Sequence, residues 1–329
     1  MGIAIPFPSV QPAGYEWLDD EPTFDPAIHL QLEAPTEILL LADLGYADGE
    51  IAKKATPVAA SSPFRLLSAE GAEIMIEIAR RLKDFRRNAG DRIENMTRGG
   101  CYRSRWLRDL CVSEDLTAHL GAIYGIEIAP HPMPVHLGHL NFEPSSIDAT
   151  IDKWHHDTLP LDFVMTVTDP ANVAGGRFEY FVGTKHEAAE LAAEGRTPPP
   201  ERTVAPDFAG PGHAIALHGD MVVHRAGPLS ELTERISMVN GYVAMDTTLD
   251  EQSRSADLIT VDDPELLWAE WARFAAWRSR GRLDAVIDQI SFGTNADAAA
   301  AALEAAIEDA QQALTEMRAG ERRLAHYGG

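Results

Sequence analysis

Residues 152–169 read DKWHHDTLPLDFVMTVTD, in which a polar cluster stands directly before a run that is typical of a β-strand. Side chains at positions i and i+2 of a strand point to the same side. His155 and Asp157 should therefore converge, while His156 points away. An imidazole and a carboxylate that project together from a strand end can supply two ligands of a 2-His-1-carboxylate metal site, which leaves coordination positions open.

The surrounding sequence predicts the kind of sheet that carries this cluster. Between residues 126 and 248, short runs rich in Val, Phe, Thr and Tyr are separated by Gly, Pro and Asp. The runs are MPVHLGHLNFEP, LDFVMTVTD, GRFEYFVGT, HAIALHG, DMVVHRAGP and RISMVNGYVAM. This spacing favours an antiparallel sandwich or barrel. Residues 185–212 interrupt it with a short helix and a Pro-rich loop, either a lid over a site or a passive surface loop.

Helical regions are expected on both sides of this core. In residues 1–125, apolar residues recur at helical spacing between Ser68 and Arg87, and a second helix is expected from Ser113 to Gly125. Asp263-Pro264 is a helix start signal within residues 249–329. We expect an α+β protein, mainly β in its core (residues 126–248), in which both helical regions belong to one integrated catalytic domain.

Heptad spacing marks the last helix. Apolar residues there alternate steps of four and three, which is typical of a coiled-coil seam: Leu303, Ile307, Ala310, Leu314 and Met317. The seam either pairs with the same helix of a second subunit, giving a homodimer, or packs against its own core.

Composition limits the partners and the compartment. The 329 residues carry a formal net charge of -23, which disfavours nucleic acid and acidic membrane surfaces because both are bound through clustered Lys and Arg. The apolar runs are too short to cross a bilayer. Only two cysteines occur, Cys101 and Cys111, as expected in a reducing cytosol. We therefore expect a cytoplasmic protein.

The position of the third metal ligand follows from chain order. The H-x-D pattern occurs twice, as His155-x-Asp157 and His218-x-Asp220, and a facial site on a sheet needs a further ligand from a later strand. After the first copy the candidates His186, His213, His218 and His224 are available. After Asp220 there remain only His224, which is too close, and His326, so the first copy is favoured. Among the four candidates after the first copy we choose His224, because it ends the apolar run MVV beside the turn RAGP, where ligand sites collect.

A basic residue follows at the start of the last core strand. Arg235 and Ser237 share a strand face by the same period of two. Burying an arginine in a β-core costs free energy unless an anion pairs with it. A guanidinium can bind a carboxylate through two hydrogen bonds. The anion is either an internal Asp or Glu or the carboxylate of an acid cosubstrate.

Together these residues resemble the iron(II) and 2-oxoglutarate dependent oxygenases over roughly residues 133–245. The resemblance consists of His155-x-Asp157, the distal His224, and Arg235-x-Ser237, in that order. The stretch GGRFEYFVGTKHE is also similar to small-molecule hydroxylases of the phytanoyl-CoA-hydroxylase-like type. The resemblance implies a double-stranded β-helix, or jelly roll, with helices packed outside it.

The resemblance also implies roles for the residues. His155, Asp157 and His224 would hold Fe(II), and Arg235 with Ser237 would bind the far carboxylate of the cosubstrate 2-oxoglutarate. Oxidative decarboxylation of 2-oxoglutarate with dioxygen would then be coupled to hydroxylation, or a related oxidation, of a small-molecule substrate. His139 and Asn141 fall on one strand face and could meet the cosubstrate or the substrate, or be structural.

Two other classes stay open on the sequence alone. One is a metal-dependent jelly-roll enzyme that does not use 2-oxoglutarate. The other is a non-catalytic β-sandwich that oligomerises through its C-terminal helix, in which these polar residues belong to an ordinary core.

Overall fold

Two antiparallel sheets form the centre of the molecule in the computed structural model, which describes residues 5–90, 92–147, 149–322 and 326–327. The larger sheet has the strand order β1-β2-β12-β9-β14-β7-β5-β4, with β3 paired to β12 and β6 paired to β14. The smaller sheet has the order β11-β10-β13-β8. The strands are β1 Ile38–Leu40, β2 Val58–Ser61, β3 Phe64–Arg65, β4 Arg87–Ala89, β5 Ile93–Thr97, β6 Ile128–Pro130, β7 His139–Asn141, β8 Asp152–His155, β9 Leu161–Thr166, β10 Phe178–Phe181, β11 Thr203–Val204, β12 His213–Leu217, β13 His224–Ala226 and β14 Ser237–Ala244.

The chain winds back and forth between the two sheets from β7 to β14. Strands β7, β9, β12 and β14 are neighbours in the larger sheet, whereas β8, β10, β11 and β13 make up the smaller one. Eight antiparallel strands that wind between two sheets in this way form a double-stranded β-helix, or jelly roll. The predicted fold class, a mainly β core with helices on either side in the sequence, is confirmed.

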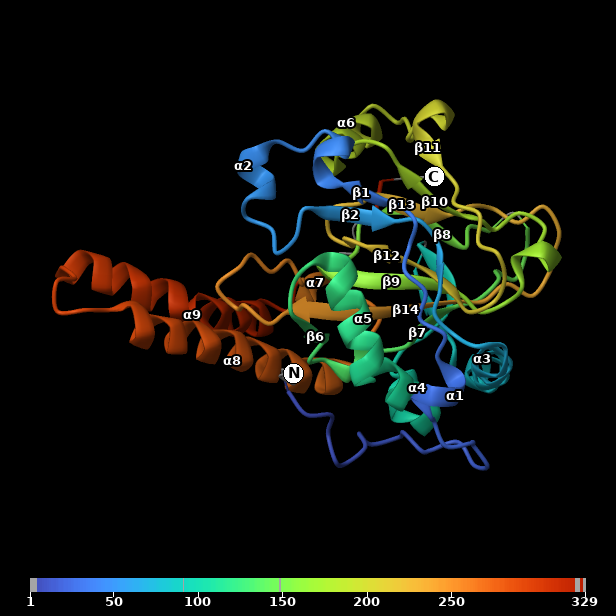
Figure 1. The fold of residues 1–329 in the computed structure, drawn as a ribbon, viewed down its shortest axis with the longest axis horizontal. Helices are drawn as coiled ribbons and strands as arrows, with labels where there is room; N and C mark the ends of the chain where they lie inside the picture. The colour runs from blue at the N-terminus through green and yellow to red at the C-terminus, as the bar shows by residue number, and fades with distance from the viewer. Residues whose placement is uncertain (1–4, 91, 148, 323–325, 328–329) are drawn as a thin grey trace.

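Helices cover the outer face of the larger sheet, as Figure 1 shows for α3, α4 and α5. Strand β12 is consequently buried along its whole length. The α-helices are α1 Pro26–His29, α2 Asp48–Ile51, α3 Ala69–Leu82, α4 Arg105–Cys111, α5 Glu114–Tyr124, α6 Lys185–Ala193, α7 Ser255–Leu258, α8 Pro264–Gln289 and α9 Ala296–Ala319. Short 3-10 turns are η1 Leu41–Leu44, η2 Lys83–Phe85, η3 Gly100–Tyr102, η4 Pro134–His136, η5 Pro170–Asn172 and η6 Pro200–Arg202.

The predicted helix starts coincide with observed caps. The Ser68 hydroxyl accepts from the Gly71 amide at the start of α3, and Ser113 caps α5, which ends at Gly125 with a positive φ of 71°. Helix α3 ends at Leu82, earlier than predicted, and continues as the turn η2. Residues 1–125 also contain β1 to β5, which the sequence did not predict and which extend the larger sheet.

The later insertion and the C-terminal region lie on other faces of the core. In the insertion 185–212, helix α6 packs Ala188 and Leu191 against Trp154 and Phe181, which places it on the outer side of the smaller sheet. The first half of α8 packs on the other end of the core. Helices α8 and α9 then run antiparallel and project away from the sheets (Figure 1). No helix in the described parts of the chain has both the length and the apolar character needed to cross a bilayer.

Candidate metal centre and acid-binding cavity

Strand pairing in the smaller sheet brings two distant histidines together. His155 ends β8 and His224 begins β13, and the two residues are direct partners in the antiparallel register. Their ring centroids are 4.2 Å apart. The Asp157 carboxylate lies between them, with Oδ1 3.4 Å from His155 Nε2 and Oδ2 3.4 Å from His224 Nε2. One ligand atom from each of the three residues lies within 4.8 Å of the others, a group that could hold a metal ion.

Backbone carbonyls orient both imidazoles. His155 Nδ1 lies 2.6 Å from the Lys153 carbonyl oxygen and His224 Nδ1 lies 3.0 Å from that of Val222. A carbonyl oxygen only accepts hydrogen bonds, so both Nδ1 atoms carry the proton and donate it. The Nε2 lone pairs therefore point toward Asp157 and are free to bind a metal. Hydrogen bonds of this kind fix the tautomer and the ring orientation of metal-binding histidines.

The surroundings of His224 and Asp157 favour the protonation states that bind metals. Burial, reinforced by the nearby His155, lowers the pKa of His224 to about 4. Burial alone would raise the pKa of Asp157, but His224 and His155 beside it hold that pKa well below its usual range. At neutral pH the group thus offers a carboxylate and a neutral imidazole at position 224, which are the forms that bind metals.

The Arg235 side chain is buried in the same cavity, and no described residue offers it a carboxylate partner. Its Nε donates to the Gly176 carbonyl oxygen at 3.1 Å and its Nη1 to the Ser237 hydroxyl at 2.8 Å. Among the described residues, no carboxylate oxygen lies within 4.0 Å of the guanidinium. Burial lowers the pKa of Arg235 to about 10, so the group is charged at neutral pH. The alternative of an internal ion pair therefore has no support in the described part of the chain.

Two further polar side chains line the same cavity and have an unpaired atom within the described part of the chain. Asn141 lies directly opposite Ser237 on the neighbouring strand, and both residues line the cavity. The Asn141 Oδ1 and the His139 Nε2 are buried without a hydrogen-bond partner among the described residues. Burial, with Arg98 as the next largest cause, lowers the pKa of His139 to about 3, so its ring is neutral. Buried polar atoms of this kind indicate that a ligand or ordered water completes the site.

Other residues line the cavity that the sequence did not indicate. Arg92 pairs with Asp152 at 2.9 Å, and the Asp152 carboxylate lies 3.4 Å from His155 Nδ1. Arg98 binds Asp262 through two nitrogens. Apolar side chains form much of the remaining wall, among them Ile93, Met96, Leu159, Leu258 and Val261. Ile93 and Met96 come from β5, and Leu258 and Val261 come from the segment around α7. Both segments are far from β8 in the sequence, and no local pattern links them to the site.

The remaining histidine candidates lie elsewhere. His218 Nε2 faces Asp220 at 3.2 Å, and Asp220 also pairs with Lys54, so the second H-x-D copy belongs to a separate buried ion cluster. His156 points away from the metal group and contacts the Tyr327 hydroxyl. His186 is exposed and faces Glu50. The choice of His224 agrees with the geometry, although its ligand role stays a prediction.

Comparisons with known proteins give distant likenesses only. No protein-family model matches the chain, and no curated protein matches it. Among solved structures, the non-heme alpha ketoglutarate dependent epimerase SnoN from nogalamycin biosynthesis is 16% identical, with a TM-score of 0.42 over 62% of this chain and 84% of its own. The carbocyclase SnoK from the same biosynthesis is 16% identical, with a TM-score of 0.43 over 65% and 88%. EctD from S. alaskensis with bound Fe is 15% identical, with a TM-score of 0.40 over 72% and 89%.

Proposed function

We propose that this protein is an Fe(II) and 2-oxoglutarate dependent oxygenase that acts on a small molecule. One observation carries the proposal: the group of buried His155, half-buried Asp157 and buried His224 shares its cavity with a buried guanidinium, Arg235, that has no carboxylate partner among the described residues.

The donor set fits a divalent iron ion. His155, Asp157 and His224 would supply two imidazole nitrogens and one carboxylate, which is the donor set of non-haem Fe(II) oxygenases. Carbonyl hydrogen bonds to both Nδ1 atoms would hold the rings in place while the ion binds.

The cationic end of the cavity fits a dicarboxylic acid. A buried charge without a partner is costly, and a bound carboxylate would offset that cost with a bidentate, charge-assisted hydrogen bond. The Ser237 hydroxyl accepts a hydrogen bond from Nη1 of Arg235, which fixes the orientation of the guanidinium and of its remaining N–H groups. We assign Arg235 and Ser237 to the far carboxylate of 2-oxoglutarate. Asn141 and His139 lie close enough along the same wall to bind cosubstrate or substrate.

The chain's own residues would contribute positioning and water exclusion to the reaction. When bound, iron and 2-oxoglutarate would supply the oxidising chemistry with dioxygen, by oxidative decarboxylation coupled to hydroxylation or a related oxidation of the substrate. His155, Asp157 and His224 would fix the ion, and Arg235 with Ser237 would fix the acid. The apolar wall of Ile93, Met96 and Leu258 would exclude water from the reacting centre.

Anaerobic titration tests the proposal directly. The protein is loaded with Fe(II) under nitrogen and titrated with 2-oxoglutarate while a visible charge-transfer band is followed. Wild type should develop the band to saturation. Arg235→Ala should raise the half-saturating concentration about 30-fold or more, because a buried carboxylate loses its charged partner. His155→Ala or His224→Ala should abolish the band.

The adjacent histidine provides the matched control. His156→Ala should leave the band unchanged, because this side chain points away from the metal group. If wild type binds Fe(II) and shows no response to 2-oxoglutarate, the protein is a metal enzyme of another kind. If it binds neither, the oxygenase proposal is wrong. Once binding is established, a screen of candidate compounds for stimulated succinate release would identify the substrate.

A further inference from the structure

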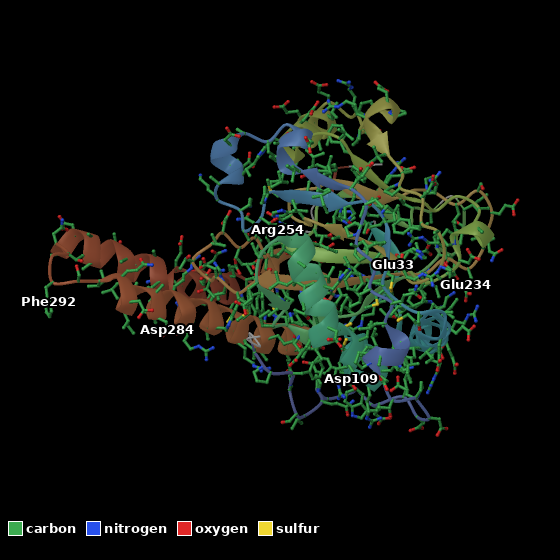
Figure 2. The ribbon with its side chains drawn as sticks, viewed as in Figure 1. Glu33, Asp109, Glu234, Arg254, Asp284 and Phe292 are labelled. Atoms are coloured by element: carbon green, nitrogen blue, oxygen red, sulfur yellow. The ribbon has the colours of Figure 1, made fainter. Side chains whose placement is uncertain are left out.

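The α8–α9 hairpin carries an apolar surface that nothing in the described structure covers. Figure 2 shows Asp284 and Phe292 on the part of the hairpin that extends beyond the sheets. Helix α9 contacts α8 through a face of small residues, with Ala306 and Ala313 buried. Polar contacts fix this packing: the Ala310 amide donates to Ser279 Oγ at 3.2 Å, and Arg282 pairs with Asp309 at 3.2 Å.

Three of the five heptad residues of α9 lie beside this contact, whereas Ala310 takes part in it and Met317 packs against the adjoining core. We call Leu303, Ile307 and Leu314 the outer stripe; their relative exposures are 50%, 37% and 51%. Ala310 and Met317, which continue the same heptad pattern, are only partly buried. The packing of α9 on α8 therefore uses one face of the helix and leaves a second, apolar face open. Large apolar side chains repeated at heptad spacing on an exposed helix face typically mark a helix–helix interface.

We propose that the outer stripe is a dimerisation surface, where α9 of a second copy of this chain packs antiparallel to α9 of the first. In antiparallel heptad packing, Leu303 lies opposite the partner subunit's Leu314, and Ile307 lies opposite the partner subunit's Ala310. Ala300 then lies opposite the partner subunit's Met317. The same contacts repeat across the two-fold axis, so the surface is self-complementary.

Charges beside the outer stripe select the antiparallel direction. Asp297, Glu304, Gln311 and Arg318 follow one another at seven-residue spacing along its edge. Antiparallel pairing places Asp297 opposite the partner subunit's Arg318 and Glu304 opposite the partner subunit's Gln311. In parallel pairing this edge would instead face the alanine-lined edge of the partner subunit (positions 299, 306 and 313), which offers Asp297 and Arg318 no opposite charge. Opposite charges along such an edge set partner choice and direction, so the Asp297–Arg318 pairs favour the antiparallel arrangement.

The net charge of the chain favours the same direction. Each subunit carries a formal charge of -23, so two bodies placed side by side would repel each other. The hairpin projects from one end of the body (Figure 1), so antiparallel pairing places the bodies at opposite ends of the helix pair. With 24 residues, α9 spans about 36 Å at about 1.5 Å per residue. Parallel pairing would bring the two bodies to the same end.

The expected dimer is reversible. One helix pair of this length buries no more than the roughly 800 Å² per partner of a standard interface, so we expect dissociation in about the micromolar range. The mass of the full-length protein is measured by light scattering and sedimentation between roughly 1 and 200 µM. The mass of wild type should rise toward twice that of the monomer.

Charge substitutions within the outer stripe test the register. Leu303→Glu with Leu314→Glu places like charges in facing layers and should give a monomer at every concentration. The matched control, Ala301→Glu with Gln312→Glu, adds the same charge at the same spacing on an exposed face that points elsewhere, and should remain a dimer. Leu303→Glu with Leu314→Lys pairs opposite charges only in the antiparallel register and should also remain a dimer.

Circular dichroism and thermal unfolding establish that each variant is folded, as expected from the half-exposed positions of both leucines. Wild type that stays monomeric over the whole concentration range would overturn the proposal. A dimer that survives Leu303→Glu with Leu314→Glu would place the interface elsewhere. A monomeric Leu303→Glu, Leu314→Lys variant would overturn the antiparallel register. None of these results depends on the proposed oxygenase function.

Discussion

A glycine lies where two segments of the metal site approach each other. The Asp157 amide donates to the Gly219 carbonyl oxygen at 2.7 Å, which links the end of β8 to the turn after β12. A Cβ at Gly219 would lie 2.7 Å from the Leu159 carbonyl oxygen and 3.0 Å from Asp157 Cβ, and would also collide with the Asp162 carboxylate. Only a residue without a side chain fits this approach.

We predict that Gly219→Ala both destabilises the fold and weakens metal binding. Overpacking of this kind typically costs about 1–3 kcal/mol, and the displaced Asp157 is a proposed ligand. Denaturant unfolding and Fe(II) titration measure the two effects. Gly210→Ala is the control, because a Cβ there meets nothing within 4 Å. Equal behaviour of the two variants would contradict the packing argument.

Glu270 is a buried carboxyl group that makes stability depend on pH. Its Oε1 accepts from the Tyr102 hydroxyl at 2.7 Å and its Oε2 from the Val135 amide at 3.1 Å. Burial nevertheless raises the pKa of Glu270 to about 7 from a usual 4.5. The carboxyl group of Glu270 therefore binds a proton more tightly in the folded state than in the unfolded state. The stabilisation from this proton is fully present below pH 4.5 and is lost as the pH rises through 7.

We therefore predict that Glu270→Gln is more stable than wild type above pH 7 and loses part of the pH dependence between about 5 and 7. The pKa shift corresponds to about 3 kcal/mol at most. The free energy of unfolding is measured at several pH values for wild type, Glu270→Gln and the control Glu265→Gln, an exposed position on the same helix. A constant difference between wild type and Glu270→Gln at all pH values would show that the carboxyl group does not titrate in this range.

At the scale of elements, α8 depends on a single capping side chain. The Asp263 carboxylate accepts from the amides of Glu265 at 2.9 Å and Leu266 at 3.3 Å, and Pro264 occupies the first helical position. The first half of this helix packs Leu267, Trp271 and Phe274 into the core. Loss of the cap should therefore destabilise the whole domain and not only the helix end.

We predict that Asp263→Ala lowers the free energy of unfolding by about 1 kcal/mol, whereas Asp263→Asn retains most of the stability because the amide oxygen still caps the helix. Denaturant unfolding of the two variants gives the comparison. If both variants lose the same amount, the charge at the helix start matters and the hydrogen bonds do not.

Helices whose ends are marked by capping residues were predicted from the sequence, whereas the short strands β1 to β5 were not. Ser113 and Gly125 bound α5, and Asp263-Pro264 starts α8, because capping depends on residues a few positions apart. The strands β1 to β5 contain two to five residues each, and their partners, such as β12 for β2 and β7 for β5, lie far along the chain. Strands this short form because they pair and pack with distant strands of the sheet, and not because of their own sequence.

At the scale of the whole molecule, the two sheets decide which predicted residues meet. His155 and His224 are 69 positions apart (224 − 155 = 69), and only the pairing of β8 with β13 places their rings in contact. Arg235 and Asn141 likewise reach one cavity through β14 and β7. The cytoplasmic location, the absence of a nucleic-acid partner and the boundaries 1–125, 126–248 and 249–329 stay predictions.

The sequence by itself determined those features that depend on neighbours along the chain. Short spacing along the chain placed His155 with Asp157 and Arg235 with Ser237, although β8 ends at His155 and β14 begins at Ser237, so neither pair shares a strand as predicted. Heptad spacing marked the face of α9 that contains the outer stripe. Only the tertiary structure decided that His224 joins the first pair, that Arg235 has no carboxylate partner among the described residues, and that α9 packs on α8 through a different face. The physical reason is that strand pairing and burial depend on closure of the two sheets, which joins residues that no local pattern relates.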